Sequence, residues 1–417
     1  MKQKELIKRN IMRTKTIISI LLAILSLTSC SDWLDVSPKT EIREEKLFSS
    51  EEGYRNALAG VYIKLGQKDL YGLQASMYIP EFLAHTWTIP TESKDPTAFY
   101  LAKNDYTNSN VETTLDELWS SYYNAIVQVN DILNNIENTN VHFSGSQKEI
   151  ITGELYGLRA FLHLDLLRLF GPVPDVSAGS KPAIPYVTSV TTDVKRLQTT
   201  SFDKVKQSIL SDLDQAESLL KDTDPYIRTI DAGDSNSDSG NTDLKENEIY
   251  RQLHLNYWAV IALKARLFYW TGEKQRAVEQ AEKVINATDS NGRKVFTLAD
   301  EEYYANNSNA NLNMKQEHVF GAYNSKFADE VVKEYYSAAD ALFTQKEEYI
   351  TSAYESNLYP DDIRNKGTRY WSKSQDSGSS TVSFHFNKYF GFGSYYGYQT
   401  VPIIRLSEMY FIVFEDA

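Results

Sequence analysis

Cys30 is the only cysteine in the 417-residue chain, and a thiol is a side chain that can be covalently modified. It follows an apolar run at residues 17–27, which is preceded by the basic residues Arg13 and Lys15. A charged stretch followed by a short apolar stretch is the layout of a secretory signal. The run is shorter than the roughly 20 apolar residues that a transmembrane helix needs. We therefore expect residues 1–29 to be a signal peptide that is removed.

The residues around the cleavage point predict the fate of the thiol. Thr28 and Ser29 are small, and small residues before a lone cysteine are typical of a bacterial lipobox, in which the cysteine is acylated and becomes the new N-terminus. Acyl chains contribute about 0.8 kcal/mol per buried CH₂ group and would hold the protein on a membrane. Residues 30–50 would then be a lipidated tether. The alternatives are an ordinary cleaved signal and a buried core thiol, and a single cysteine cannot form an intramolecular disulfide.

The other side chains that could catalyse or ligate lack the spacing that such chemistry needs. The six histidines show no HExxH pairing, and no GxSxG or Cys/His signature is present. Residues 234–246 place oxygen ligands at alternate positions, but Ser239 stands where a calcium loop needs glycine and Lys245 where it needs glutamate, so a solvated loop is favoured. Two facing carboxylates for glycoside hydrolysis can be neither shown nor excluded among 56 acidic residues. We predict no catalytic residue, no metal site and no cofactor.

The charge balance limits the partners. The chain carries 56 acidic and 43 basic residues, for a formal net charge of −13. Because nucleic acids and anionic lipids repel such a surface, we expect no nucleic acid partner. The sign of the charge says nothing about a neutral ligand. The 28 tyrosines outnumber the 18 phenylalanines, and tyrosine suits half-exposed positions because it joins an apolar face to a polar tip.

Helical periodicity dominates the middle of the chain. Apolar side chains recur every three or four residues within 115–136, 147–170 and 202–220, as one face of a helix requires. The second of these helices should end at Gly171, because the prolines that follow cannot continue the hydrogen-bond ladder. Beyond residue 290 the periodicity fades into aromatic-rich sequence with Gly, Ser and Asn breaks.

Two further helices, 254–270 and 274–285, should form a hairpin joined at Gly272. Glycine allows the tight turn, and the small side chains of Ala265 and Ala277 let the two helices approach closely. The spacing of these residues resembles part of a tetratricopeptide repeat.

Blocks along nearly the whole chain resemble one family, the SusD/RagB-like outer-membrane lipoproteins. In chain order the blocks are 115–119 with Tyr123 and Asn130, 154–160 with 168–174, 212–220, 254–285, 362–364 and 404–410. The resemblance implies a mainly α, SusD-like fold built on tetratricopeptide-like helix pairs, with an irregular segment containing few short strands packed alongside. We expect residues 51–417 to form a single domain, with the helical-repeat scaffold at about 111–286 and the aromatic-rich part at about 287–417.

The same resemblance implies a function. Members of the family are lipid-anchored on the outer membrane at the cell surface, and they are not enzymes. They bind oligosaccharides, or peptides in some branches, and pass them to a SusC-like TonB-dependent transporter. A non-binding helical-repeat adaptor is the alternative, and a hydrolase is disfavoured. Relatives continue beyond Ala417, so we expect the C-terminal part to be incomplete and a helix at about 401–417 to expose apolar side chains.

A sugar site needs aromatic planes beside carboxylates, amides or arginine, because sugars present an apolar C–H face and a rim of hydroxyls. Aromatics in helical stripes usually pack in the core, so we discount Trp119, Trp258 and Trp270 in favour of aromatics in irregular sequence. The candidate ligand-binding residues are Trp87, Tyr100, Asn104 and Tyr106, with Trp371 as an alternative platform and Tyr303 with Tyr304 as a third. For each aromatic residue, burial in the core is the competing interpretation.

Replacing the predicted lipidated cysteine tests the membrane anchor. We expect the Cys30→Ala protein to stay in the soluble fraction after cell fractionation, because it has no acyl chain to hold it, whereas the unchanged protein sediments with membranes. Equal recovery of both proteins in the membrane fraction would contradict lipidation.

Overall fold

The computed structural model describes residues 44–191, 198–228, 248–299, 313–337, 342–362, 364–365, 370–375, 382–389 and 399–415. The chain divides into two units. Met1–Ser49 contains the short helix α2 (Glu44–Leu47), and Ser50–Ala417 contains the other elements given below. The predicted signal peptide, Cys30, Tyr303, Tyr304 and the loop 234–246 lie outside the described residues.

The long helices of the second unit follow the sequence periodicity closely. They are α3 (Glu51–Leu65), α6 (Ser109–Glu137), α7 (Gln147–Phe170), α8 (Phe202–Leu220), α10 (Tyr257–Trp270) and α11 (Lys274–Ile285). The predicted bounds of α7, α8 and α11 agree with the structure. Helix α10 begins three residues later than predicted, because the side chain of Asn256 caps it by accepting from the backbone N–H of Ala259 at 3.0 Å. Within the described part of the chain, no helix is both long and apolar enough to cross a bilayer.

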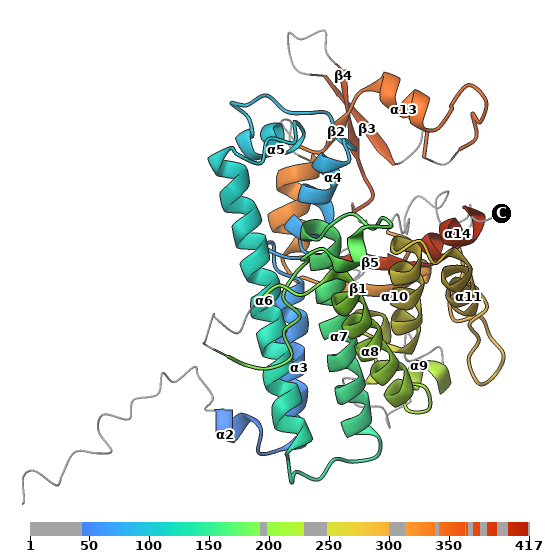
Figure 1. The fold of residues 1–417 in the computed structure, drawn as a ribbon. Helices are drawn as coiled ribbons and strands as arrows, with labels where there is room; N and C mark the ends of the chain where they lie inside the picture. Colours follow the sequence, from blue (N-terminus) through green and yellow to red (C-terminus); the bar gives the residue numbers. More distant parts are fainter. Residues whose placement is uncertain are drawn as a thin grey trace, which may run out of the picture. The chain divides into compact units, whose positions relative to one another are not determined.

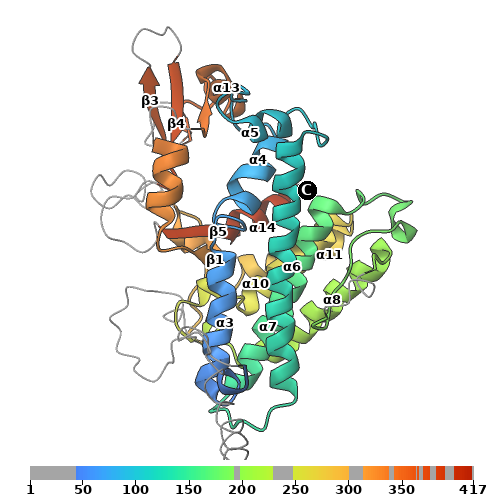
Figure 2. The same ribbon diagram turned by 90° about the vertical axis from the view of Figure 1, so that its left-hand side faces the viewer.

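These helices pack as neighbours in space. Helix α7 lies between α6 and α8, and α10 forms a hairpin with α11 (Figure 1). Figure 2 shows α3 alongside α6 and α7. In the hairpin, Gly272 has a φ of 79°, which glycine adopts without strain, and the side chains of Ala265 and Ala277 are fully buried. The mainly α, tetratricopeptide-like architecture is confirmed.

Short helical pieces connect the long helices. They are η1 (Gln74–Tyr78), α4 (Ile79–Leu83), α5 (Pro96–Leu101), η2 (Ala178–Ser180), α9 (Pro225–Arg228) and η6 (Arg251–Leu253). The first three lie between α3 and α6, so helical structure starts well before the scaffold boundary expected at residue 111.

Among the described residues after α11, the chain forms two small sheets and four more helical pieces. Strand β1 (His318–Tyr323) pairs antiparallel with β5 (Thr400–Arg405), and β4 (Val382–Phe386) lies between β2 (Thr344–Gln345) and β3 (Trp371–Gln375). The helical pieces are η7 (Lys315–Glu317), η8 (Ala328–Ser337), α13 (Glu347–Ala353) and α14 (Leu406–Phe414). This confirms the expected irregular segment with few short strands.

The prediction of one helix at about 401–417 is wrong at its start. Residues 400–405 form β5, because the β-branched Val401 and Ile404 bury their side chains where β5 pairs with β1. In the following helix, Met409 and Ile412 are buried, whereas Phe411 and Phe414 are 62% and 67% exposed. Part of the predicted apolar surface is therefore exposed and part is covered.

A buried ion cluster joins α3, α7 and the segment before α10. The side chains of Arg251, Glu154 and Asp224 are all fully buried. Arg251 donates from Nη1 to Glu154, and from Nε and Nη2 to Asp224 at 3.0 Å each. Glu154 also accepts from the Tyr62 hydroxyl at 2.5 Å and contacts Nδ1 of His254 at 3.0 Å. Burial alone would raise the pKa of Glu154, but Arg251 and His254 outweigh burial and hold the pKa at about 2.

A leucine at Ala265 or Ala277 should destabilise the hairpin. Both alanines are fully buried, and a larger side chain would overpack the contact, so we expect each substitution to lower the free energy of unfolding by about 1–3 kcal/mol. Denaturant unfolding measures the effect. Gln275→Leu, at an exposed position of α11, is the control and should stay within about 0.5 kcal/mol. An unchanged midpoint for both alanine variants would mean that the two helices are not in close contact.

Acid should destabilise the fold through Glu154. The pKa of Glu154 is about 2 in the folded protein and ordinarily 4.5, so its stabilising effect is present above about pH 4.5 and is lost as the pH falls toward 2. Glu154→Gln removes one of the two buried carboxylates that balance Arg251, and we expect it to lower the free energy of unfolding by about 3–5 kcal/mol at pH 7. The difference in unfolding free energy between the two proteins should shrink as the pH falls from about 4.5 toward 2. Denaturant titrations at each pH measure it. Glu149→Gln, exposed on the same helix, should show neither effect.

Candidate functional site

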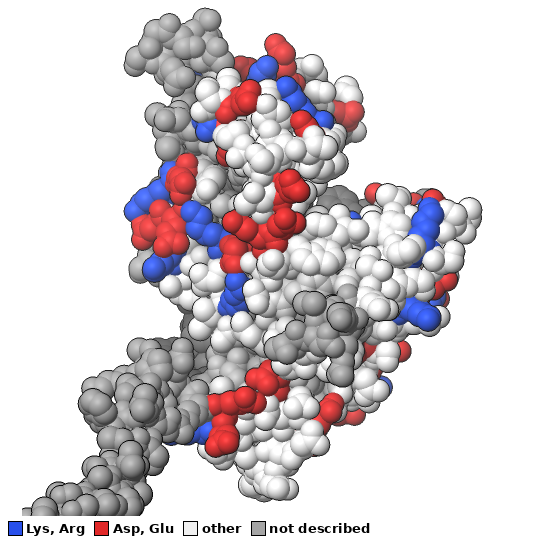
Figure 3. Space-filling view, turned by 60° about the vertical axis from the view of Figure 1, so that its left-hand side comes forward, with Lys and Arg blue, Asp and Glu red and all other residues white. Residues whose placement is uncertain are grey.

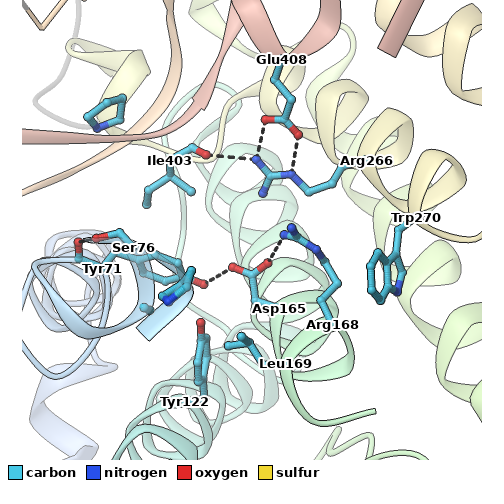
Figure 4. Close-up of a pocket in the computed structure, with 13 residues that line it drawn as sticks. Tyr71, Ser76, Tyr122, Asp165, Arg168, Leu169, Arg266, Trp270, Ile403 and Glu408 are labelled. Atoms are coloured by element: carbon cyan, nitrogen blue, oxygen red, sulfur yellow. Dashed lines mark hydrogen bonds and ion pairs between the residues drawn. The ribbon is translucent and has the colours of Figure 1, made fainter. Parts of the chain in front are cut away.

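A pocket of about 370 Å³ opens where segments distant in the sequence meet. Its walls come from the turn before η1, η1 itself, α4, α6, α7, α10, β5 and α14 (Figure 4). The polar and aromatic residues of the lining are Tyr71, Ser76, Tyr122, Asp165, Arg168, Arg266, Trp270 and Glu408.

The helical repeat places the charged residues of the pocket. Asp165 and Arg168 are three residues apart on α7, and Arg266 and Trp270 are four residues apart on α10. Residues at these spacings lie on one face of a helix, so each helix presents two side chains to the same cavity.

Asp165 organises one side of the pocket. Its carboxylate accepts a hydrogen bond from the Tyr71 hydroxyl at 2.7 Å and one from Nη1 of Arg168 at 3.0 Å. The ring of Tyr122 meets that of Tyr71 edge-on, with centroids 6.0 Å apart. Burial, together with the negative charge of Asp165, raises the pKa of both tyrosines, so both phenols stay neutral at physiological pH.

Arg266 organises the other side. Its Nε and Nη2 each donate to the Glu408 carboxylate at 2.7 Å, which is the paired geometry that a planar guanidinium favours. Nη2 also donates to the backbone carbonyl of Ile403 at 3.0 Å. Burial lowers the pKa of Arg266, but Glu408 outweighs burial and raises it overall, so the side chain carries its charge.

Trp270 forms an aromatic wall of the pocket. The guanidinium of Arg168 lies 5.9 Å from its ring centroid, within the range of a cation–π contact. A second hollow of about 340 Å³ shares Trp270, Arg168, Arg266 and Glu408 and is also lined by Phe411. The two hollows therefore adjoin along the same four side chains.

The pocket combines ion-paired carboxylates with an aromatic wall. Both of its carboxylates are ion-paired with arginine, Asp165 with Arg168 and Glu408 with Arg266. Among the described residues, no cluster of three or more His, Cys, Asp or Glu side chains could hold a metal ion. An aromatic ring beside several hydrogen-bonding groups is the composition of a small-molecule binding site.

The prediction that Trp87 and Trp371 are exposed platforms is wrong. Trp87 is only 7% exposed, because its ring stacks on Phe343 with centroids 5.3 Å apart and meets Tyr336 edge-on at 6.1 Å. Trp371 is 9% exposed and packs on Phe386 at 4.9 Å. Both rings are covered by aromatic residues of the C-terminal part, and truncating them would leave a cavity in the core.

The other described candidates lie together on the surface around the end of α5, and none of them lines the pocket. Tyr106 is 51% exposed and donates to Oδ1 of Asn104 at 3.2 Å. The Tyr100 hydroxyl donates to Glu92 at 2.7 Å. Asn104 and Tyr106 are therefore exposed and in contact, whereas Tyr100 is half-buried and pairs with Glu92 instead. Tyr303 and Tyr304 fall outside the described residues.

Sequence reasoning missed Trp270. The apolar helical stripe to which it belongs predicts a core position. In the structure Trp270 is only half-buried, and it lines both hollows. Two signals could have identified it. Trp270 is the last residue of α10, next to the turn at Gly272, and it follows Arg266 by four residues. An aromatic residue at a helix end beside a cation on the same face often stands at the edge of the core.

Figure 3 shows how charged side chains are distributed over one face of the molecule. Acidic and basic side chains form separate small groups on the face shown, and neither sign covers it continuously. Nucleic acid binding calls for a continuous basic stripe, which this face lacks.

The sequence comparisons identify related proteins. A SusD-like family model, described as starch-binding associating with outer membrane, matches residues 32–230. Two SusD-like proteins of Formosa agariphila are 24% and 27% identical over 220 and 201 residues, which is 51% and 48% of this chain and 39% and 36% of those relatives. The matches thus span less than half the length of these curated relatives.

Solved structures share the fold. A SusD superfamily protein from Bacteroides thetaiotaomicron superposes with a TM-score of 0.62 at 18% identity, over 87% of this chain and 75% of that one. A SusD-like carbohydrate binding protein from Bacteroides vulgatus gives 0.61 at 16% identity, over 88% and 71%. A laminarin binding SusD-like protein gives 0.56 at 15% identity, over 88% and 80%.

Proposed function

Because the chain belongs to the SusD-like family, we propose that it captures oligosaccharides at the outer membrane and passes them to a partner TonB-dependent transporter. The description of the matching family model and the ligand named for one similar structure support a glycan as the ligand class. Lipidation at Cys30 would hold the protein at the cell surface, and a SusC-like transporter would be its partner.

The geometry that carries this proposal is the pocket beside Trp270. A tryptophan ring offers a plane for the C–H face of a sugar, while Arg168, Ser76 and the backbone of β5 offer hydrogen-bonding groups for hydroxyls. Release to a transporter requires that the bound glycan leave unchanged. A site whose carboxylates are both neutralised by arginine meets that requirement, because nothing in it is arranged to cleave a glycosidic bond.

Removing the tryptophan ring tests the site. We expect Trp270→Ala to weaken binding of the best ligand from an oligosaccharide panel by roughly 1–3 kcal/mol in titration calorimetry, a loss typical of an aromatic anchor. The fold should persist, because the side chain is only half-buried.

Two variants make the result specific. Trp258→Ala removes an equally half-buried ring from the opposite end of the same helix and should leave affinity unchanged. Tyr106→Ala probes the exposed patch near α5 and should also leave affinity unchanged. A loss with Tyr106→Ala alone would move the site to that patch, and a protein that binds no member of the panel would contradict glycan capture.

A further inference from the structure

We propose that the pocket recognises a carboxylate group, and that the ligand is therefore an acidic oligosaccharide that carries uronic-acid-type sugars. This inference rests on the proposed function and narrows it from oligosaccharides in general to a charged class. It is carried by the hydrogen-bond donors of two arginines that open on one cavity.

The first donor belongs to a buried arginine. The Arg266 side chain is 10% exposed, and its Nε and Nη2 are engaged by Glu408 and by the carbonyl of Ile403. Its Nη1 has no hydrogen-bond partner among the described residues and points into the pocket (Figure 4). Nη1 is not among the polar atoms sealed off without a partner, so its N–H groups reach the open cavity and can donate to a ligand oxygen.

The second set of donors belongs to Arg168. Only its Nη1 makes a hydrogen bond among the described residues, to Asp165 at 3.0 Å, and the side chain is 40% exposed. Its Nε and Nη2 are therefore available to a ligand. Figure 4 shows the Arg168 and Arg266 guanidinium groups on the same side of the cavity, with Trp270 beside them.

Both carboxylates of the pocket already accept hydrogen bonds from an arginine. Each oxygen of Asp165 accepts one hydrogen bond, from Tyr71 or from Arg168, and each oxygen of Glu408 accepts one from Arg266. Both carboxylates are thus already paired with a cation, whereas Arg266 Nη1 and Arg168 Nε and Nη2 carry N–H groups that no described residue accepts. A carboxylate supplies acceptors only, and its planar shape matches the guanidinium fork in a way that a hydroxyl does not.

Trp270 favours an acidic sugar over the other common source of carboxylates, a peptide. A pyranose ring stacks its C–H face on an aromatic plane while its carboxylate reaches the neighbouring cations. A peptide carboxylate needs the cations but has no general use for the ring. The wall therefore suits a ligand that is cyclic and charged at once.

Calorimetry with matched ligand pairs tests the inference. The probes are trisaccharides of galacturonic, glucuronic and mannuronic acid, the methyl ester of each, and a tripeptide with a free carboxylate, all titrated into the full-length chain. Esterification removes the charge and keeps the ring shape. We expect the best acidic trisaccharide to bind about tenfold tighter than its own ester, as a charge-assisted hydrogen bond would give.

The contribution of Arg168 to carboxylate recognition is then tested against Arg276 as a matched control. Arg168→Gln should reduce the preference for acid over ester to less than about threefold, and this ratio is the readout because Arg168 also contacts neutral parts of a ligand. Arg276→Gln should keep the full preference. Arg276 is also a partly exposed arginine that pairs with a carboxylate three residues away and lies over an aromatic ring, but it is outside the pocket.

The outcomes separate this inference from the proposed function. Equal binding of an acid and its ester, or a preference that survives Arg168→Gln, overturns carboxylate recognition and leaves glycan capture standing. Tighter binding of the tripeptide than of every trisaccharide assigns the carboxylate to a peptide and overturns the acidic sugar. No binding of any trisaccharide, acid or ester, together with failure on the neutral panel, contradicts both.

Discussion

Arg251 is a cation with no exposed surface, and a charge in that position must be balanced by the groups around it. The balance comes from Glu154 on α7 and from Asp224 after α8. Asp224 also accepts from the backbone N–H of Tyr257 at 2.7 Å, in the first turn of α10. One cation therefore fixes where α10 starts relative to α7, and these two helices carry the arginines of the pocket. The geometry of the candidate site depends on a cluster that does not line it.

A second buried network fixes the neighbouring helices. Arg159 on α7 makes two hydrogen bonds to Asp212 on α8, at 2.6 and 2.8 Å, and one to Asn130 on α6 at 3.0 Å. His163 donates from Nδ1 to the carbonyl of Arg159 and accepts at Nε2 from the backbone N–H of Val187. That pattern needs a neutral ring, which agrees with a pKa lowered to about 3 by burial. The buried polar side chains of these helices thus specify how the helices pack, because their hydrogen bonds can all form in only one arrangement.

The helices could be predicted from the sequence because their signal is local. A stripe of apolar side chains with a breaker such as Gly171 at its end determines α7 within its own residues. The site could not be predicted in the same way, since its walls come from segments up to several hundred residues apart. Trp87 illustrates the limit: its flanking sequence is irregular and polar, as at a surface, but Phe343 covers it from the far end of the chain. Trp270 shows the opposite error. The apolar periodicity of α10 indicates a core position for it, but the packing of β5 and α14 leaves a cavity beside its ring.

Arg266 links the helical scaffold to the C-terminal segment through its hydrogen bonds. It sits on the helical scaffold, and it holds the carbonyl of Ile403 in β5 and the carboxylate of Glu408 in α14. The pocket therefore exists only while residues 400–414 are docked on the scaffold. A ligand that binds there and not to the undocked chain must, by thermodynamic linkage, shift the equilibrium toward docking in proportion to its concentration. Occupancy of the cavity and the resistance of this segment to proteolysis are then two measurements of one equilibrium.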